Sequence, residues 1–209
     1  MRLGVAILSL VLCLLGAPIS HGFQTWQDLR FKGVVRQGQD FSCGVASLVS
    51  LINERFRVNY SEETVLLEFM RTLSESRVED VITNGLTMAD LKATAEALGF
   101  EAHAVRIGLI QLARTGHPAI VYVERDTLRH FVLFDGLDGD EVLLRDPMLG
   151  NRRMLIESFL QIWKGRTALF VVSPSHPTGE TPRPRGDEKS TKQATRNLLY
   201  APKFRTLGK

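Results

Sequence analysis

The chain has 209 residues, of which 44% are hydrophobic and 23% charged, a composition typical of a globular protein with one core and not of a coiled coil or a repeat protein. Its formal net charge of +3 is uneven: residues 173–209 hold eight basic and three acidic residues (+5) and Arg2 adds +1, which leaves −3 for residues 23–172. The excess of positive charge therefore lies in the tail, and we expect no nucleic-acid partner.

Residues 1–22 have the layout of a secretory signal peptide. Arg2 precedes an apolar run from Leu3 to Leu15, and small residues follow as far as Gly22. The apolar run is shorter than the roughly 20 residues that a membrane-spanning helix needs. We therefore expect cleavage after Gly22, a periplasmic or otherwise exported protein, and no permanent membrane span; a retained anchor is the alternative.

Removal of this segment would take Cys13 away and leave Cys43 as the one cysteine of the mature chain. A lone thiol is either a buried apolar side chain or a chemically active group. Cys43 begins the run CGVASLVSLINERF, whose apolar spacing predicts a helix over 43–56, with Asp40 or Ser42 as its cap. At the start of a helix, free amide groups and partial positive charge favour a thiolate.

Two further helices are predicted in the first half of the chain. One covers residues 61–70, and another covers 87–98, where Thr87 and Asp90 have the spacing of a capping box. The residues between them, 73–85, are predicted as a loop. The first half of the body is therefore helical.

The second half of the body is predicted to be mainly strands. The expected strands are 100–106, 119–123, 129–135, 141–146 and 168–172, and the expected short helices are 107–113 and 155–163. Helices followed by an antiparallel sheet describe an α+β domain, which we place at residues 23–172. Residues 173–209 hold five of the eight prolines and are predicted to be a basic disordered tail, with a docking segment at 198–207 as the alternative.

A cysteine nucleophile needs a general base, usually a histidine that a carboxylate or amide orients. The mature body, residues 23–172, holds three histidines, and of these His103 and His117 have no acidic residue that local geometry would place beside them. His130 begins a predicted strand whose hairpin partner ends at Asp146. Taken singly, His130 could be a histidine whose hydrogen bonds are satisfied at a sheet edge, and Asp146 could be a turn residue. Together with Cys43 they suggest a nucleophile with a general base and an orienting carboxylate.

The hairpin loop decides whether His130 and Asp146 meet. If residues 137–139 form a three-residue loop, Gly136 pairs with Asp140, and His130 lies opposite Asp146 on one face of the sheet. A two-residue turn at 138–139 would shift the register by one residue and place the pair on opposite faces.

The run QGQDFSCG places two glutamines shortly before Cys43. The side-chain amide of Gln37, together with the backbone amide of Cys43, could stabilise the oxyanion of an acyl-transfer reaction, and Gln39 is the rival candidate. One cysteine and scattered histidines offer none of the paired spacings typical of zinc sites, and no glycine-rich phosphate loop is present. We therefore expect no metal and no cofactor.

Residues 34–172 contain a series of short motifs, each of which occurs once. They are Gln37 six positions before Cys43, Cys43-Gly44 with Ala46 and Leu48, Gly85-Leu86-Thr87 ahead of LGFEAHAV, Pro118-Ala119-Ile120, His130-Phe131-Val132, Asp146-Pro147 with Gly150, and Phe159 with Trp163 and Gly165. In this ordered set the chain resembles the bacteriocin-processing, double-glycine leader peptidases, a papain-like family of cysteine peptidases.

The resemblance implies a papain-like fold, with N-terminal helices packed on an antiparallel sheet. It implies Cys43 as nucleophile, His130 as general base and then acid, Asp146 as the residue that orients His130, and Gln37 in the oxyanion hole. Members commonly have an acidic residue directly before the cysteine, where this chain has Ser42. Many members are cytoplasmic domains of membrane exporters, whereas this chain looks like a free-standing exported relative, similar to the peptidases of functional-amyloid secretion systems.

We therefore expect a cysteine peptidase that cleaves an exported polypeptide through an acyl-enzyme on Cys43. The expected partner is an envelope protein that serves a secretion or amyloid-assembly system. Two other functions stay open. One is a cell-wall peptide hydrolase or amide transferase, and the other is a non-catalytic chaperone or adaptor that holds a secreted chain.

Overall fold

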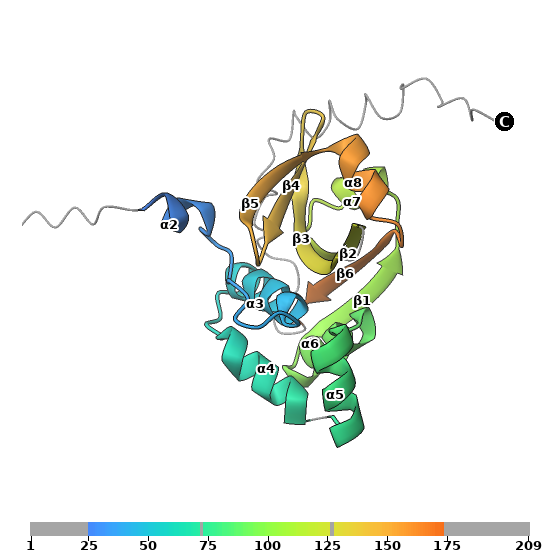
Figure 1. The fold of residues 1–209 in the computed structure, drawn as a ribbon. Coiled ribbons are helices and arrows are strands. Elements are labelled where there is room, and N and C mark those ends of the chain that lie inside the picture. Colours follow the sequence, from blue (N-terminus) through green and yellow to red (C-terminus); the bar gives the residue numbers. More distant parts are fainter. Residues whose placement is uncertain (1–24, 72, 126–127, 174–209) are drawn as a thin grey trace, which may run out of the picture.

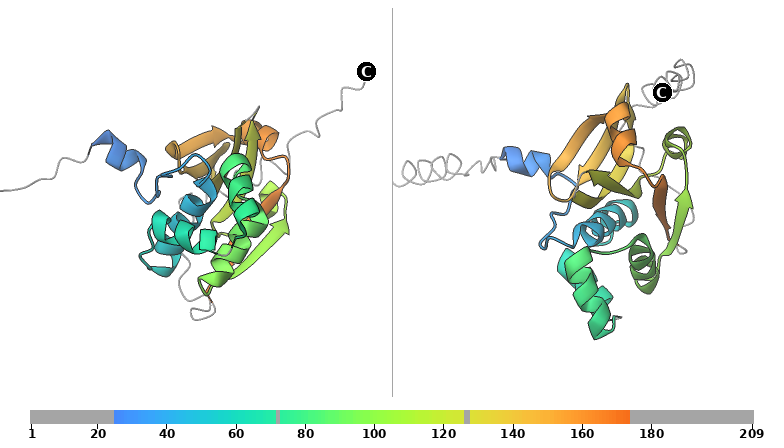
Figure 2. Two further views of the ribbon diagram at one scale, coloured as in Figure 1. Left: turned by 60° about the horizontal axis from the view of Figure 1, so that its bottom comes forward. Right: turned by 45° about the vertical axis from the view of Figure 1, so that its right-hand side comes forward.

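The computed structural model describes residues 25–71, 73–125 and 128–173, so the predicted signal peptide and residues 174–209 of the predicted tail lie outside the described residues. The described chain forms one six-stranded sheet with helices on both faces (Figures 1 and 2). The strand order is β1-β6-β2-β3-β4-β5, and each neighbouring pair is antiparallel. The predicted α+β class is confirmed.

The helices are α2 (Trp26–Arg30), α3 (Cys43–Phe56), α4 (Glu62–Arg71), α5 (Glu75–Asn84), α6 (Met88–Ala97), α7 (Leu109–Arg114) and α8 (Ile156–Ile162). The strands are β1 (Glu101–Arg106), β2 (Ala119–Arg125), β3 (Leu128–Asp138), β4 (Glu141–Asp146), β5 (Gly150–Leu155) and β6 (Thr167–Val172).

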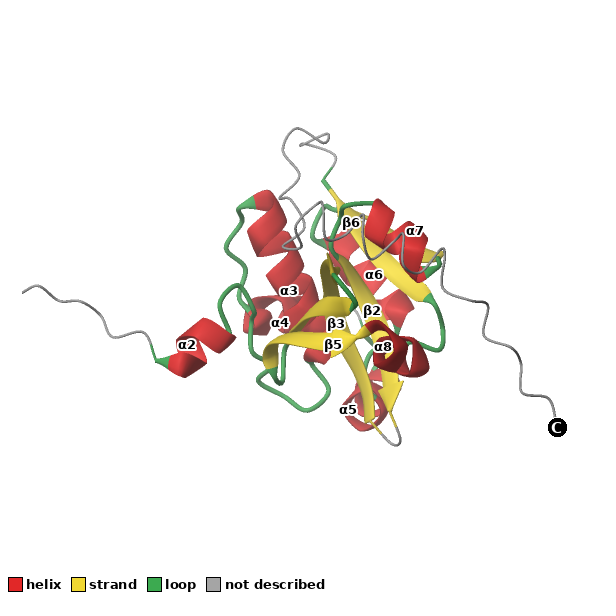
Figure 3. Ribbon diagram, turned by 90° about the horizontal axis from the view of Figure 1, so that it is seen from above, coloured by secondary structure: helices red, strands yellow, loops and turns green. Residues whose placement is uncertain are grey.

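Helix α3 is the central helix of the domain, and every residue from Cys43 to Ile52 is buried. It lies between the sheet on one side and α4 on the other (Figures 1 and 3). The predicted starts of the two following helices are confirmed. The Ser61 hydroxyl accepts the Thr64 N–H at 3.1 Å, and Thr87 forms the predicted capping box at the start of α6.

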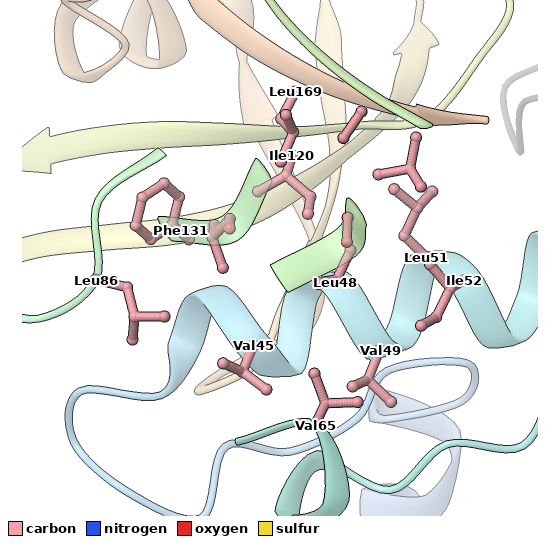
Figure 4. Close-up of a cluster of buried hydrophobic side chains, with 14 of the residues drawn as sticks. Val45, Leu48, Val49, Leu51, Ile52, Val65, Leu86, Ile120, Phe131 and Leu169 are labelled. Carbon is pink, nitrogen blue, oxygen red and sulfur yellow. The ribbon is translucent and has the colours of Figure 1, made fainter. Parts of the chain in front are cut away.

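Two apolar clusters cover the two faces of the sheet. Alternate side chains of β2, β3 and β6, including Ile120, Phe131 and Leu169, join Leu48 of α3 in one cluster (Figure 4). The intervening side chains of the same strands pack against α7 and α8 in the other cluster. This strict alternation is what the period-two geometry of a strand requires when both faces are buried.

Three elements differ from the sequence-based expectation. The predicted loop over 73–85 is wrong, because residues 75–84 form α5, which directs Val81 into the core while its other residues are partly or fully exposed. One apolar anchor in ten residues is a weak periodic signal. Helix α2, with no buried residue, and strand β5, which contains Asn151 and two arginines, were not predicted.

The β3–β4 hairpin has neither of the two predicted turns. Asp138 pairs with Glu141, so the turn consists of Gly139 and Asp140 instead of residues 137–139. Gly139 does take the expected left-handed conformation, with a φ of 62°. A two-residue turn at this position, continued without interruption, would separate the candidate histidine and aspartate onto opposite faces.

A β-bulge at Asp135 corrects the register. Beyond it Phe134 pairs with Leu144, a shift of one residue relative to the pairs nearer the turn. An extra residue in one strand of a ladder exchanges the two faces for everything that follows. His130 and Asp146 therefore share a face, as expected, although the bulge and not the loop is the reason. The prediction that the two residues lie directly opposite each other is wrong, because the register that ends with Leu133 paired to Arg145 places Asp146 at position 132.

Close packing of α3 predicts a stability effect at Gly44. A Cβ there would lie 2.9 Å from Leu91 Cδ2 and 3.1 Å from Phe131 Cδ2, both in buried side chains that have little room to move. We expect Gly44→Ala to lower the free energy of unfolding by about 1–3 kcal/mol in urea denaturation. The control is Gly165→Ala, whose Cβ would meet no atom within 4 Å. Equal stabilities for the two variants would contradict the packing.

Candidate active site

The candidate site lies where β4 stops pairing with β3. The last pair is Leu133 with Arg145, and β3 continues beyond it to Leu128. On this freed edge the Phe131 N–H points to Cys43 Sγ at 3.5 Å, and the Phe131 carbonyl accepts a hydrogen bond from Ser47 Oγ at 3.3 Å. The first turn of α3 thus occupies the place beside β3 that β4 has left.

This arrangement brings together three of the predicted residues, although they are far apart in sequence. Cys43, the first residue of α3, is a free cysteine with 7% of its surface exposed. His130 lies next to Phe131 on β3, and its Nε2 is 2.8 Å from Oδ1 of Asp146 at the end of β4. Both side chains of this pair are buried. Because Asp146 engages Nε2, the Nδ1 atom of His130 is left for Cys43.

Asp146 is held rigidly by the turn that follows it. Its Oδ1 also accepts the backbone N–H groups of Met148 and Leu149, at 2.9 and 3.1 Å. Its Oδ2 accepts a hydrogen bond from Arg152 Nη1 on β5 at 3.2 Å. Sequence reasoning did not foresee Arg152, because β5 itself was not predicted. The carboxylate that orients His130 is therefore fixed at both oxygens.

The pKa of His130 is raised from 6.5 to about 9. Burial by itself lowers it, because burial disfavours the imidazolium cation, but hydrogen bonds to Asp146 and Cys43 and the negative charges of both outweigh burial. The pKa of Asp146 is lowered: burial raises it, while the hydrogen bond and charge of His130 and the two backbone N–H donors lower it. Both shifts favour the imidazolium form of His130 and the carboxylate form of Asp146.

Gln37 lies in the turn that precedes Cys43. Its Nε2 donates to the Gln39 carbonyl at 3.1 Å, and its backbone N–H donates to the carbonyl of Pro147 at 3.2 Å, beside Asp146. Its Oε1 is buried and has no hydrogen-bond partner among the described residues. An amide NH₂ has two hydrogens, so one orients the group, and the second has no partner among the described residues. Gln39, the rival candidate, contributes its backbone here.

The other two histidines lie away from this site. His103 is an exposed residue of β1, at the opposite edge of the sheet from β4 and β5, and its Nε2 lies 3.9 Å from Oε2 of Glu101. His117 precedes β2, and burial lowers its pKa, with a further contribution from Arg55. Within the described segments, no group of three or more His, Cys, Asp or Glu side chains is arranged to hold a metal ion.

The raised pKa of His130 predicts its titration. A folded-state pKa above the unfolded value means that the imidazolium stabilises the fold fully below pH 6.5, and that this contribution is lost as pH rises toward about 9. We expect His130 to titrate near 9 by NMR of its imidazole. Asp146→Asn should lower that pKa and flatten the fall in unfolding free energy from pH 6.5 to 9. A wild-type pKa near 6.5 would contradict the geometry.

Comparison with known proteins identifies a family for this chain. The model of the peptidase C39 family matches residues 32–175. A probable functional amyloid protease, FapD, of Pseudomonas fluorescens is 32% identical over 150 residues, which cover 72% of this chain and 65% of that protein. This chain thus spans less than two thirds of the length of that relative.

Solved structures of peptidase domains share the fold. The peptidase domain of Streptococcus ComA, a bi-functional ABC transporter, has a TM-score of 0.56 at 24% identity over 67% of this chain and 97% of that domain. A double glycine motif protease from an AMS/PCAT transporter, in complex with the leader peptide, has a TM-score of 0.55 at 23% identity, over 67% and 90%. The expected papain-like fold is confirmed. Because the family match includes every element from α3 to β6, this chain belongs to the peptidase C39 family of cysteine peptidases.

Proposed function

We propose that Cys43 is the nucleophile of this cysteine peptidase, with His130 as its acid and base and Asp146 as the residue that orients His130. The observation that carries the proposal is the buried chain of contacts from Cys43 through His130 to Asp146, with 2.8 Å between His130 Nε2 and Asp146 Oδ1. His130 is hydrogen-bonded to the Cys43 side chain, and we infer that the two groups react as a thiolate and an imidazolium.

The reaction then runs in two halves. The Cys43 thiolate attacks the scissile carbonyl carbon, and the imidazolium of His130 gives its proton to the leaving amine as the C–N bond breaks. The product of this half is a thioester on Cys43 and a free amine. His130, now neutral, takes a proton from water as the water attacks the thioester, and the carboxylic acid leaves as the thiolate and imidazolium are restored.

The oxyanion of each tetrahedral intermediate needs hydrogen-bond donors. We assign this role to the backbone N–H of Cys43 and the free amide hydrogen of Gln37. The hydrogen bond from Gln37 Nε2 to the Gln39 carbonyl supports it, because it holds the amide in one orientation before substrate binds. The hydrogen bond between the Gln37 backbone and Pro147 joins this turn to the loop after Asp146.

For the substrate, we propose an exported polypeptide that belongs to a secretion or functional-amyloid assembly system. The similarity to a probable functional amyloid protease supports this class, and a structural neighbour was solved with a leader peptide. The signal-like layout of residues 1–22 supports export to the periplasm, with cleavage after Gly22. In the part of the chain that the structure describes, no helix has the length and apolarity needed to cross a membrane.

Substitutions at the four residues should separate their roles. We expect Cys43→Ala to abolish cleavage and His130→Ala to be nearly as damaging, because each removes a group that forms or breaks bonds. Asp146→Asn and Gln37→Ala should cost about 10- to 1000-fold in kcat/KM. His117→Ala, away from the site, is the control for His130→Ala. Turnover by a folded Cys43→Ala variant would disprove the mechanism.

The client can be found by comparing cells that carry wild-type and Cys43→Ala protein. Mass spectrometry of the N-termini of envelope proteins should show one polypeptide that accumulates uncleaved with the variant. Release of muropeptides from purified cell wall by the wild type alone would instead favour a cell-wall hydrolase. A Cys43 no more reactive toward iodoacetamide than a model thiol at neutral pH would favour a binding protein.

A further inference from the structure

A carboxylate from α4 holds the turn that leads to Cys43. The backbone N–H of Gly38 lies 2.9 Å from Oε2 and 3.1 Å from Oε1 of Glu62, and the Ser42 hydroxyl lies 2.5 Å from Oε1. Glu62 is the first residue of α4 and is separated from Ser42 by twenty positions in sequence. One side chain therefore binds both ends of the Gly38–Ser42 segment.

The lack of a side chain at residue 38 allows this approach. A Cβ on Gly38 would lie 3.0 Å from Glu62 Oε2, closer than nearly all Cβ contacts in proteins. At the other end of the segment, Ser42 has 0% of its surface exposed. With Glu62 in place water does not reach the Ser42 hydroxyl, and a buried polar group left without a partner is costly.

The direction of the hydrogen bonds follows from the proton count at Ser42. Its Oγ lies within reach of two acceptors, Glu62 Oε1 at 2.5 Å and the Gln39 carbonyl at 2.9 Å, but a hydroxyl has one proton. The charged and nearer acceptor takes it. The Ser42 oxygen is then free to accept the Gln39 N–H, which lies 3.1 Å away.

Gln39 in turn orients Gln37. The Gln39 carbonyl accepts the Ser42 backbone N–H at 3.2 Å and one amide hydrogen of Gln37 at 3.1 Å. A continuous series of hydrogen bonds thus runs from the Glu62 carboxylate through Ser42 and Gln39 to the side-chain amide of Gln37. If the first member is removed, the amide loses the support that gives it one orientation.

We propose that Glu62 is a positioning residue that directs the free amide hydrogen of Gln37 at the oxyanion. This inference rests on the proposed role of Gln37, and it makes α4 part of the catalytic apparatus through its contacts with the turn before Cys43. Preorganised donors are effective because no reorientation is needed when charge develops. Loss of Glu62 should therefore slow steps that form an oxyanion and spare reactions of Cys43 that form none.

Two small probes separate these effects in the full-length protein. Acylation of Cys43 by p-nitrophenyl acetate passes through an oxyanion, as the thiolate attacks the ester carbonyl and p-nitrophenolate leaves. Alkylation by iodoacetamide displaces iodide from carbon and forms no oxyanion. We expect Glu62→Ala to slow acylation about 10-fold while alkylation changes less than about twofold. The matched control is Glu63→Ala, the same loss of charge at the neighbouring exposed residue, which should leave both rates unchanged.

A double-mutant cycle tests the link to Gln37. If Glu62 acts through Gln37, the double variant Gln37→Ala, Glu62→Ala should acylate no more slowly than Gln37→Ala alone. If the double variant acylates more slowly than Gln37→Ala by the factor that Glu62→Ala alone produces, the proposal is overturned. An equal loss in the acylation and alkylation rates of Glu62→Ala would also overturn it. If Glu62→Ala does not fold, as judged by circular dichroism, the same cycle with Glu62→Gln decides, because that amide keeps the shape and loses the charge.

Amide exchange keeps this test separate from the peptidase assignment. Hydrogen exchange of the Gly38 N–H should quicken in Glu62→Ala and not in Glu63→Ala, whatever the protein catalyses. An unchanged exchange rate of the Gly38 N–H in Glu62→Ala overturns the proposal, because the hydrogen bond between Gly38 and Glu62 is the contact on which it rests. A wild-type Cys43 that p-nitrophenyl acetate acylates no faster than a model thiol counts against the proposed function, and Gly38 exchange then reports on the Glu62 contact alone.

Discussion

The structure depends on the point at which β4 leaves β3. Pairing ends at Leu133 and Arg145, and the backbone groups of Phe131 that β4 would have bonded go instead to Cys43 and Ser47 of α3. Buried backbone groups must find partners, so the helix and the strand edge satisfy each other. The same contact places the Cys43 thiol beside the His130 imidazole. The packing of α3 against β3 therefore also assembles the site.

A buried ion network holds this junction together. Arg145 Nη2 lies 2.8 Å from Oδ1 of Asp135, the bulge residue, and its Nη1 bonds Glu54 of α3 and, at 3.2 Å, the Gly33 carbonyl. Arg145 and Asp135 are almost fully buried. Breaking such a pair leaves an uncompensated charge, which is far more costly than the net value of the intact pair. The network therefore ties the bulge to the helix that carries Cys43.

The segment before α3 joins the two halves of the site. The side-chain amide of Asn151 donates hydrogen bonds to the backbone carbonyls of Arg30 and Lys32. Gly150, with a φ of 79°, packs so closely that a Cβ there would lie 2.5 Å from the Arg30 carbonyl oxygen. The turn that fixes Asp146 thus rests against the chain that leads to Gln37. Ser42, directly before Cys43, donates its hydroxyl proton to a carboxylate that α4 supplies.

The sequence by itself determined the α+β class, the helices over 43–56, 61–70 and 87–98, and the choice of Cys43, His130 and Asp146, because capping residues, apolar periodicity and family motifs are local signals. It did not reveal α5 or β5, whose few apolar residues leave little periodicity. Only the tertiary structure decided the register of the hairpin, since the bulge residue Asp135 bonds Arg145, which is held in turn by Glu54 of α3, 91 positions away in sequence. The contact of Glu62 with the turn before Cys43 is likewise tertiary, because it joins residues that no sequence period relates.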